Sequence, residues 1–349
     1  MGRTRRIRKK NREKGTAGTC DYIEQDSFHQ RSVEKYSQLM KWMVGNGFKG
    51  SFLQVAEFPG IGRGLRATAD IKPGDILVSI PQELLITVSK VLKSELGPII
   101  KGQNCSMTPQ QILSVFLLFE DAKGTSSFWY PYLKILPTIF NTPAFYSEEE
   151  LQLLPKGMYI LAKEQSGKIL SAYKDLYSFY EVLKAKYPEL IISDHLSYER
   201  FQWAWYAVNT RCVYMEQPEK EHGNFVMAPF LDLLNHSPTV QTEAVFDPYI
   251  NCYNIKTETH FKRWQQVFIC YGSLGNDKLL LDYGFVVSNN QHSTVTFDTD
   301  DIVHCFDEIQ DCEAESLHNK KLQIIQKKLG AVFIYLQESP PVVKKGQLI

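Results

Sequence analysis

The pattern of apolar and polar residues divides the chain into three successive parts. Up to residue 81, an amphipathic helix is predicted over 31–46, and short apolar runs between glycine- and proline-containing turns predict strands at 51–58 and 76–80. Residues 84–200 have mostly helical spacing, and residues 244–270 return to strand-like runs. Strands followed by helices and then by strands predict an α+β fold rather than a doubly wound sheet.

The helical spacing is clearest over residues 110–120, 147–154, 161–186 and 198–208. An aromatic-rich stretch at 128–133 lies between these segments, and clustered aromatic residues usually form core. Further along, 214–226 is polar and predicts a loop, 244–246 and 252–256 predict a β-hairpin, and 267–270 and 294–297 predict strands. Helical spacing returns at 317–329.

Residues 228–238, with the sequence APFLDLLNHSP, combine an apolar run with polar groups. The run should be buried, yet it ends in Asn235 and His236. Burying an amide and an imidazole costs a few kcal/mol, of the order of 1–3 kcal/mol each, unless each group finds a partner. A short helix followed by a turn would account for this stretch without any function.

A second stretch makes a functional interpretation stronger. Residues 267–273, VFICYGS, predict a buried strand that ends at Tyr271 and a glycine. Residues 279–285, LLLDYGF, predict an apolar helical turn that closes on Tyr283, a glycine and Phe285. Two tyrosine-glycine pairs after an Asn-His pair indicate a site built from separate parts of the chain.

Composition narrows the class of protein. The 349 residues are 44% hydrophobic and 22% charged with a net charge of zero, so the body has no general preference for nucleic acid or membrane. Seven scattered cysteines without a Cys-x-x-Cys pair indicate free thiols in a reducing compartment and make a structural zinc unexpected. No apolar run has the length of a membrane span, and the first residues do not resemble a secretory signal.

Positive charge is concentrated in the first residues of the sequence. Residues 1–14, MGRTRRIRKKNREK, are mostly basic, and we expect residues 1–30 to form a disordered, solvated tail. Such a run is also typical of a nuclear-localisation signal or of a weak nucleic-acid contact. These features predict a protein of the nucleus and cytoplasm.

Taken together, the motifs resemble the SET-domain methyltransferases, and within them the Rubisco-methyltransferase-like class. The resemblance spans about residues 35–300 and is carried by 59–68 (PGIGRGLRAT), 71–81 (IKPGDILVSIP), 208–211 (VNTR), 230–238 and 267–272. It implies a SET β-fold over 31–300 with a knot-like C-terminal crossing and a helical insertion at about 90–200. Residues 301–349 would then be the remnant of a truncated C-terminal helical lobe that binds substrate.

The resemblance also implies roles for individual residues. Tyr271 matches the catalytic tyrosine, which orients the incoming amine; the alternative is a core tyrosine in a turn. The residues that match cofactor-binding positions are Asp75, Leu77, Arg211, Asn235, His236, Tyr283 and Phe285. Arg211 would meet the carboxylate of S-adenosylmethionine, although a surface salt bridge is an alternative, and Asp232 would support the crossing. No metal is implied.

The function implied is an S-adenosylmethionine-dependent protein-lysine N-methyltransferase that acts on a histone or a non-histone protein, without a metal or a membrane. Protein-histidine methylation is an alternative within the class, and the apolar Cys212, Val213 and Leu231 favour lysine over it. A truncated, cofactor-binding isoform with little catalytic activity is an alternative of another class. The presence of Tyr271 argues against it.

Overall fold

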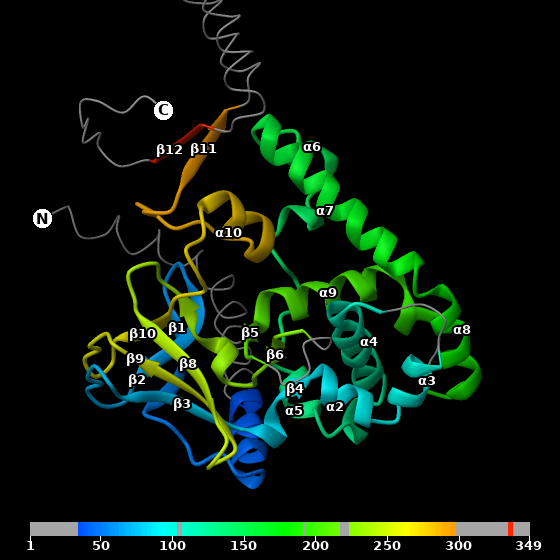
Figure 1. Ribbon diagram of the computed structural model, residues 1–349, viewed down its shortest axis with the longest axis horizontal. Coiled ribbons are helices and arrows are strands. Elements are labelled where there is room, and N and C mark those ends of the chain that lie inside the picture. Colours follow the sequence, from blue (N-terminus) through cyan, green and yellow to red (C-terminus); the bar gives the residue numbers. More distant parts are fainter. Residues whose placement is uncertain (1–33, 103–106, 191–192, 217–222, 298–333, 338–349) are drawn as a thin grey trace, which may run out of the picture. The chain divides into compact units, whose positions relative to one another are not determined.

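The computed structural model describes residues 34–102, 107–190, 193–216, 223–297 and 334–337 (Figure 1). The described chain forms two units: one comprises residues up to 139, 167–235 and 241–268, and the other comprises 140–166, 236–240 and 269 onward. The expected basic tail at 1–30 and the helical segment at 317–329 lie outside the described residues, as does most of the expected lobe remnant at 301–349.

The first unit begins with a helix over residues 34–45, which confirms most of the helix expected at 31–46. Strands β1 (Leu53–Phe58) and β2 (Gly62–Ala67) follow and form an antiparallel hairpin. Their sheet has the order β1-β2-β10-β7, where β10 is Gln266–Ile269 and β7 is Asn235–His236. The division between the two units falls within β10 and β7. This sheet brings the glycine-containing strand β2 beside the strand that precedes Tyr271.

Two more sheets belong to the first unit. One has the order β3-β9-β8, formed by β3 (Ile76–Pro81), β9 (Cys252–Thr257) and β8 (Thr242–Asp247), and these strands lie side by side in Figure 1. The other has the order β4-β6-β5, formed by β4 (Ile86–Thr87), β6 (Phe225–Met227) and β5 (Cys212–Tyr214). The loop predicted over 214–226 was therefore wrong at both ends, because Tyr214 lies in β5 and residues 225–226 lie in β6. A strand of three residues is too short to show periodicity, and β6 forms because it pairs with β4 and β5 at once.

Helices fill the chain between β4 and β5. In the first unit they are α2 (Val88–Lys93), α3 (Gly97–Lys101), α4 (Pro109–Ala122), α5 (Tyr130–Leu133), α8 (Tyr177–Lys186) and α9 (Tyr198–Arg211). Among the described residues, the short 3-10 helices of this unit are η1 (Gln82–Leu84), η2 (Gly124–Ser126), η4 (Ser193–Leu196) and η6 (Leu231–Leu233). Helix α4 packs against α9, where the side-chain amide of Gln110 donates to the carbonyl of Trp205 over 3.2 Å.

The helix expected over 161–186 is two helices, α7 (Lys156–Lys174) and α8. No glycine or proline marks the break, so the sequence pattern runs through it. The break occurs at Leu176, whose side chain is buried together with those of Phe179 and Tyr180. Tertiary packing of these side chains therefore decides where α8 begins.

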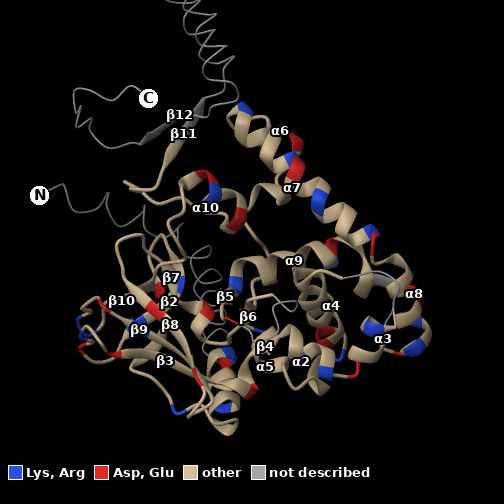
Figure 2. Ribbon diagram, in the orientation of Figure 1, with Lys and Arg blue, Asp and Glu red and all other residues tan. Residues whose placement is uncertain are grey.

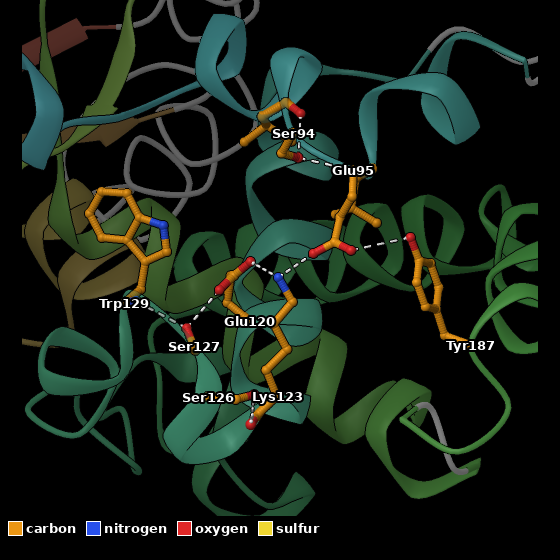
Figure 3. Close-up of polar contacts among 10 residues, drawn as sticks. Ser94, Glu95, Glu120, Lys123, Ser126, Ser127, Trp129 and Tyr187 are labelled. Carbon is orange, nitrogen blue, oxygen red and sulfur yellow. Dashed lines mark hydrogen bonds and ion pairs between the residues drawn. The ribbon is translucent and has the colours of Figure 1, made fainter.

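A polar network fastens the end of α4 to its surroundings (Figure 3). The ammonium group of Lys123 lies 2.6 Å from a carboxylate oxygen of Glu120 and 2.5 Å from one of Glu95. Ser127 donates to the other oxygen of Glu120 over 2.6 Å, and Tyr187, just after α8, donates to Glu95 over 3.4 Å. Burial acts to lower the pKa of Lys123, but the two carboxylates outweigh burial and raise this pKa. The network thus holds three segments of the helical region in register.

The second unit contains η3 (Pro143–Phe145), α6 (Glu148–Leu151), the start of α7, α10 (Asn276–Tyr283) and the antiparallel pair β11 (Thr294–Phe297) and β12 (Ile334–Gln337). Helix α10 ends at Gly284, which is left-handed with φ 79°. A Cβ at Gly284 would lie 2.7–2.9 Å from backbone atoms of Asn141 and Thr142, so a side chain does not fit there. Helices α7 and α10 are joined by the amide of Gln165, which donates to Asp282 over 3.0 Å.

Charged residues do not form a separate layer in the described chain. Figure 2 shows acidic and basic residues interspersed along the helices, in keeping with the net charge of zero. No helix among the described residues is long and apolar enough to cross a membrane.

Candidate active site

In the first unit, Asn235 of β7 is bonded to the glycine-containing strand β2. Its side-chain Nδ2 donates to the backbone carbonyl of Arg63 over 2.8 Å. At Gly64 an added Cβ would lie 2.8 Å from this Nδ2 and 2.7 Å from Nε2 of Gln266. Only glycine allows the amide of Asn235 to approach β2 this closely. The structure therefore places the glycine motif at 59–68 next to Asn235, which is a predicted cofactor-binding residue.

The same unit holds a partly buried ion pair between Arg211 and Asp232, and Asp232 lies three residues before Asn235. Nη1 of Arg211, at the end of α9, donates to Oδ2 of Asp232 over 3.1 Å and to the carbonyl of Asp232 over 3.0 Å. The hydroxyl of Tyr132, in α5, donates to the same Oδ2 over 2.8 Å. The Asp232 side chain is fully buried, whereas that of Arg211 is 13% exposed. This partly buried pair replaces the surface salt bridge considered for Arg211.

Burial sets the electrostatics of this cluster. It raises the pKa of the Asp232 carboxyl, and the opposing effects of Arg211 and Tyr132 only partly offset that shift. Burial, together with the neighbouring Asp232, also raises the pKa values of the Tyr132 hydroxyl and the Cys212 thiol. Oδ1 of Asp232 has no hydrogen-bond partner among the described residues. Oδ1 of Asp232 is therefore a buried acceptor to which no described residue donates.

The backbone before Asp232 is strained. Phe230 has φ 71°, a conformation that costs a bulky residue of the order of 1–3 kcal/mol. Its ring is 1% exposed and packs against Phe48 with the ring centroids 5.6 Å apart. The apolar run at 230–234 is buried, as predicted, and its packing holds the turn that leads to Asn235.

In the second unit, four predicted residues form one group of rings. Tyr271 lies beside His236 and Tyr283, with ring centroids 5.1 Å and 5.2 Å away, and Phe285 lies 6.2 Å from both His236 and Tyr283. The rings of Tyr271 and Phe285 meet edge to face at 6.5 Å. Such a group presents ring faces and edges that suit a cationic amine or a planar base.

His236 is held as a neutral imidazole. The backbone N–H of Tyr271 donates to Nδ1 of His236 over 3.0 Å, so the proton of the neutral ring lies on Nε2. Burial, followed by the nearby His292, lowers the pKa of His236 and favours this neutral form. The side chain is 7% exposed, and Nε2 has no partner among the described residues. His236 thus carries a buried donor that is available to a ligand.

The two remaining predicted positions lie at β3 in the first unit, with Asp75 directly before this strand and Leu77 within it. The carboxylate of Asp75 accepts from the backbone N–H of Lys72 over 2.8 Å and closes the turn before β3. The side chain of Leu77 is 1% exposed within β3. Both roles are structural, and a contact of their backbone with the cofactor stays a prediction.

Tyr132 was missed as a site residue. The sequence pattern predicts only that it belongs to the aromatic core at 128–133, and it is indeed fully buried. Its bond to Asp232 joins residues 100 positions apart, and no local pattern indicates such a contact. Arg63 was recognised only as part of the glycine motif.

Each unit holds a buried polar group that fits S-adenosylmethionine, which has donors and acceptors on its adenine, its ribose and its amino-acid end. Nε2 of His236 is a buried donor without a partner, and Oδ1 of Asp232 is a buried acceptor without one, in each case among the described residues. Buried polar groups without partners are rare in native proteins and indicate a missing partner such as a ligand or water. Within the described part of the chain, no three His, Cys, Asp or Glu side chains lie together as metal ligands would.

The model of the SET-domain family matches residues 62–272, which include β2, the helical region, Asn235, His236 and Tyr271. The chain belongs to the SET-domain methyltransferase family, and its cofactor is that of the family, S-adenosylmethionine. This confirms the SET fold and the cofactor expected from the motifs. The knot-like crossing stays a prediction.

Among curated proteins, the chain is similar to SET domain-containing protein 4 of Mus musculus, with 36% identity over 86% of this chain and 68% of that protein. SET domain-containing protein 4 of Homo sapiens is 35% identical over 84% of this chain and 66% of that protein. The actin-histidine N-methyltransferase of Homo sapiens is 28% identical, and the chain spans 47% of its length.

Solved structures show the same fold. The SET domain of LSMT bound to lysine and AdoHcy matches with a TM-score of 0.65 and 22% identity, over 88% of this chain and 68% of that one. Rubisco LSMT bound to AdoMet matches with a TM-score of 0.58 and 23% identity, over 88% of this chain and 68% of that one.

Proposed function

We propose that this chain is a protein-lysine N-methyltransferase. The observation that carries the proposal is the group of rings around Tyr271, in which His236 and Tyr283 lie 5.1 Å and 5.2 Å away. Aromatic walls attract a lysine ammonium as it arrives, and a dry environment lowers the pKa of the amine so that it can lose its proton. A neutral amine is the form that accepts a methyl group.

When bound, S-adenosylmethionine supplies a methyl group on a positively charged sulfur. The residues of this chain bind and orient the reactants. Asn235, which is held at the backbone of Arg63, is assigned to cofactor binding, and Arg211, which shares its charge with Asp232, is assigned to the carboxylate of the cofactor. The hydroxyl of Tyr271 orients the amine, and the surrounding rings exclude water. Alignment of this kind contributes about 7–11 kcal/mol at most to lowering the barrier.

Histidine methylation is the second candidate, because relatives at 28% identity are actin-histidine N-methyltransferases. Lysine is supported by the fully buried Leu231 and by the half-buried Cys212 and Val213, which offer few groups to fix an imidazole. It is also supported by the fold match to LSMT bound to lysine.

The target is a protein, and either a histone or a non-histone protein fits the proposal. The basic residues 1–14 support a nuclear fraction beside a cytoplasmic one. They would also allow a weak contact with nucleic acid. Deleting residues 2–14 and locating a tagged chain tests this part of the proposal, and an unchanged distribution would contradict it.

The chemistry is tested with an isotopically labelled methyl donor and two substrates: a histone-peptide array and a cell lysate. Mass spectrometry then assigns each methylated residue. We expect label on lysine with the wild-type chain and little label with Tyr271→Phe. Label on histidine would establish the second candidate. Cofactor binding without any transfer would instead establish the non-catalytic, cofactor-binding alternative.

A further inference from the structure

The side chain of Arg63 fastens β2 to two distant segments of the first unit. Its Nη1 donates to the hydroxyl oxygen of Tyr36 over 2.7 Å and to the backbone carbonyl of Ile135 over 2.9 Å. Tyr36 belongs to the helix over residues 34–45, and Ile135 follows α5. One guanidinium therefore joins the start of the described chain and the helical region to β2.

The backbone of the same residue faces Asn235. The carbonyl of Arg63 accepts from Nδ2 of Asn235, and Gly64 leaves the space that the amide occupies, since an added Cβ there would lie 2.8 Å from Nδ2. A carbonyl can only accept, so this bond decides which end of the amide faces β2. The amide oxygen of Asn235 is consequently directed away from the Arg63 carbonyl. The orientation of Asn235 thus depends on where the peptide between Arg63 and Gly64 lies.

The chain around this peptide has little stiffness of its own. Gly60 and Gly62 have φ values of 73° and 83°, and glycine loses more conformational freedom on folding than any other residue. Side-chain bonds at Arg63 offset that loss by fixing the strand directly after the two glycines. Both acceptors are uncharged, so geometry rather than charge determines the anchoring.

We propose that Arg63 is a positioning residue for S-adenosylmethionine, acting through its own carbonyl and Asn235. This inference rests on the proposed function, since it concerns binding of the cofactor that the proposed reaction uses. It assigns to Arg63, which lies between Gly62 and Gly64, a role distinct from that of these glycines. A variant without the arginine side chain still has the backbone carbonyl at position 63 that accepts from Asn235, but the position of this carbonyl is no longer fixed.

The test is calorimetric titration with S-adenosylmethionine of the wild-type chain, Arg63→Leu, Arg63→Lys and the matched control Arg66→Leu. Arg66 lies on the same strand, but its side chain has other partners: it donates to Gln54 over 3.0 Å and stacks on Trp264 at 4.8 Å. The thermal midpoint without cofactor is measured for each variant. It separates a general loss of stability from a loss of affinity.

We expect Arg63→Leu to raise the Kd about tenfold or more, because two hydrogen bonds that fix the peptide are lost. Arg63→Lys should restore part of the affinity, because an ammonium keeps donors but lacks the planar fork. Arg66→Leu should change the Kd less than about twofold, as is usual for a surface substitution. An unchanged Kd for Arg63→Leu would overturn the inference, as would equal weakening by Arg63→Leu and Arg66→Leu.

A further variant keeps the inference testable if Arg63→Leu does not fold. Tyr36→Phe removes one acceptor and leaves the arginine in place, and it should raise the Kd by about two- to fivefold. Unchanged affinity in this variant would overturn the inference. Failure of the proposed function is distinguishable, because it would appear in the transfer assay as no label on lysine with the wild-type chain, whereas failure of this inference appears only in the relative Kd values of the variants.

Discussion

The backbone N–H of Tyr271 donates a hydrogen bond to Nδ1 of His236 over 3.0 Å. This bond joins the end of β10 to β7 across 35 residues of sequence. It holds the main chain at Tyr271 independently of the tyrosine hydroxyl, and it fixes the tautomer of His236. The two residues singled out in separate motifs thus depend on each other for their orientation.

Because the main chain at Tyr271 is held by His236, Tyr271→Phe should leave the fold intact. We expect turnover to fall about a hundredfold or more, which is the usual cost of removing one positioned polar group. The affinity for S-adenosylmethionine, measured by calorimetry, should change little. Turnover close to that of the wild-type chain would mean that Tyr271 serves only as packing.

The stability of the second unit should depend on pH through His236. Its pKa is lowered in the folded chain, so the unfolded chain binds more protons once the pH falls below about 6.5. This contribution to stability is present above pH 6.5 and is lost as the pH falls toward the lower folded pKa. Urea unfolding at several pH values between about 7.5 and 5 measures it.

The matching variant is His236→Gln, which cannot titrate. We expect its free energy of unfolding to fall less steeply with decreasing pH than that of the wild-type chain. Equal slopes for the two chains would show that His236 does not carry this dependence.

Asn235→Asp should weaken cofactor binding. The substitution keeps the shape but places an oxygen 2.8 Å from the carbonyl of Arg63, where Nδ2 now donates. We expect the Kd for S-adenosylmethionine to rise at least about tenfold. Asn46→Asp is the control, because Nδ2 of Asn46 also donates to a backbone carbonyl, that of Trp42, over 2.7 Å. Equal affinities for the two variants would contradict the assignment of Asn235.

Tyr132→Phe should lower the stability of the first unit by about 1–3 kcal/mol, because a buried carboxylate loses a hydrogen bond. Tyr173→Phe is the control: its hydroxyl donates over 2.8 Å to an uncharged acceptor, the carbonyl of Leu196. That loss should cost about 0.5–1.5 kcal/mol. Urea denaturation compares the two, and a larger effect at Tyr173 would mean that Asp232 does not need its tyrosine.

The local pattern of apolar and polar residues predicted a helix or strand correctly wherever that pattern is regular along the whole element. The strand at 53–58, the helix at 109–122 and the hairpin at 242–257 lie close to their predicted positions, because alternation and helical spacing follow directly from burial of one face. Local pattern failed to predict the elements whose bounds depend on contacts with residues that are distant in the sequence. The break at Leu176 and the strand at Phe225–Met227 result from packing and pairing with distant residues.

The sequence by itself determined the family and the order of the motifs, because Asn235, His236 and Tyr271 lie in short stretches whose residues are recognisable one after another. Only the tertiary structure determined which hydrogen bonds hold the residues of these motifs in place. The bonds from Tyr132 to Asp232 and from Asn235 to the carbonyl of Arg63 join residues 100 and 172 positions apart. A hydrogen bond depends on distance in space and not on separation along the chain, so such partners leave no local pattern to read.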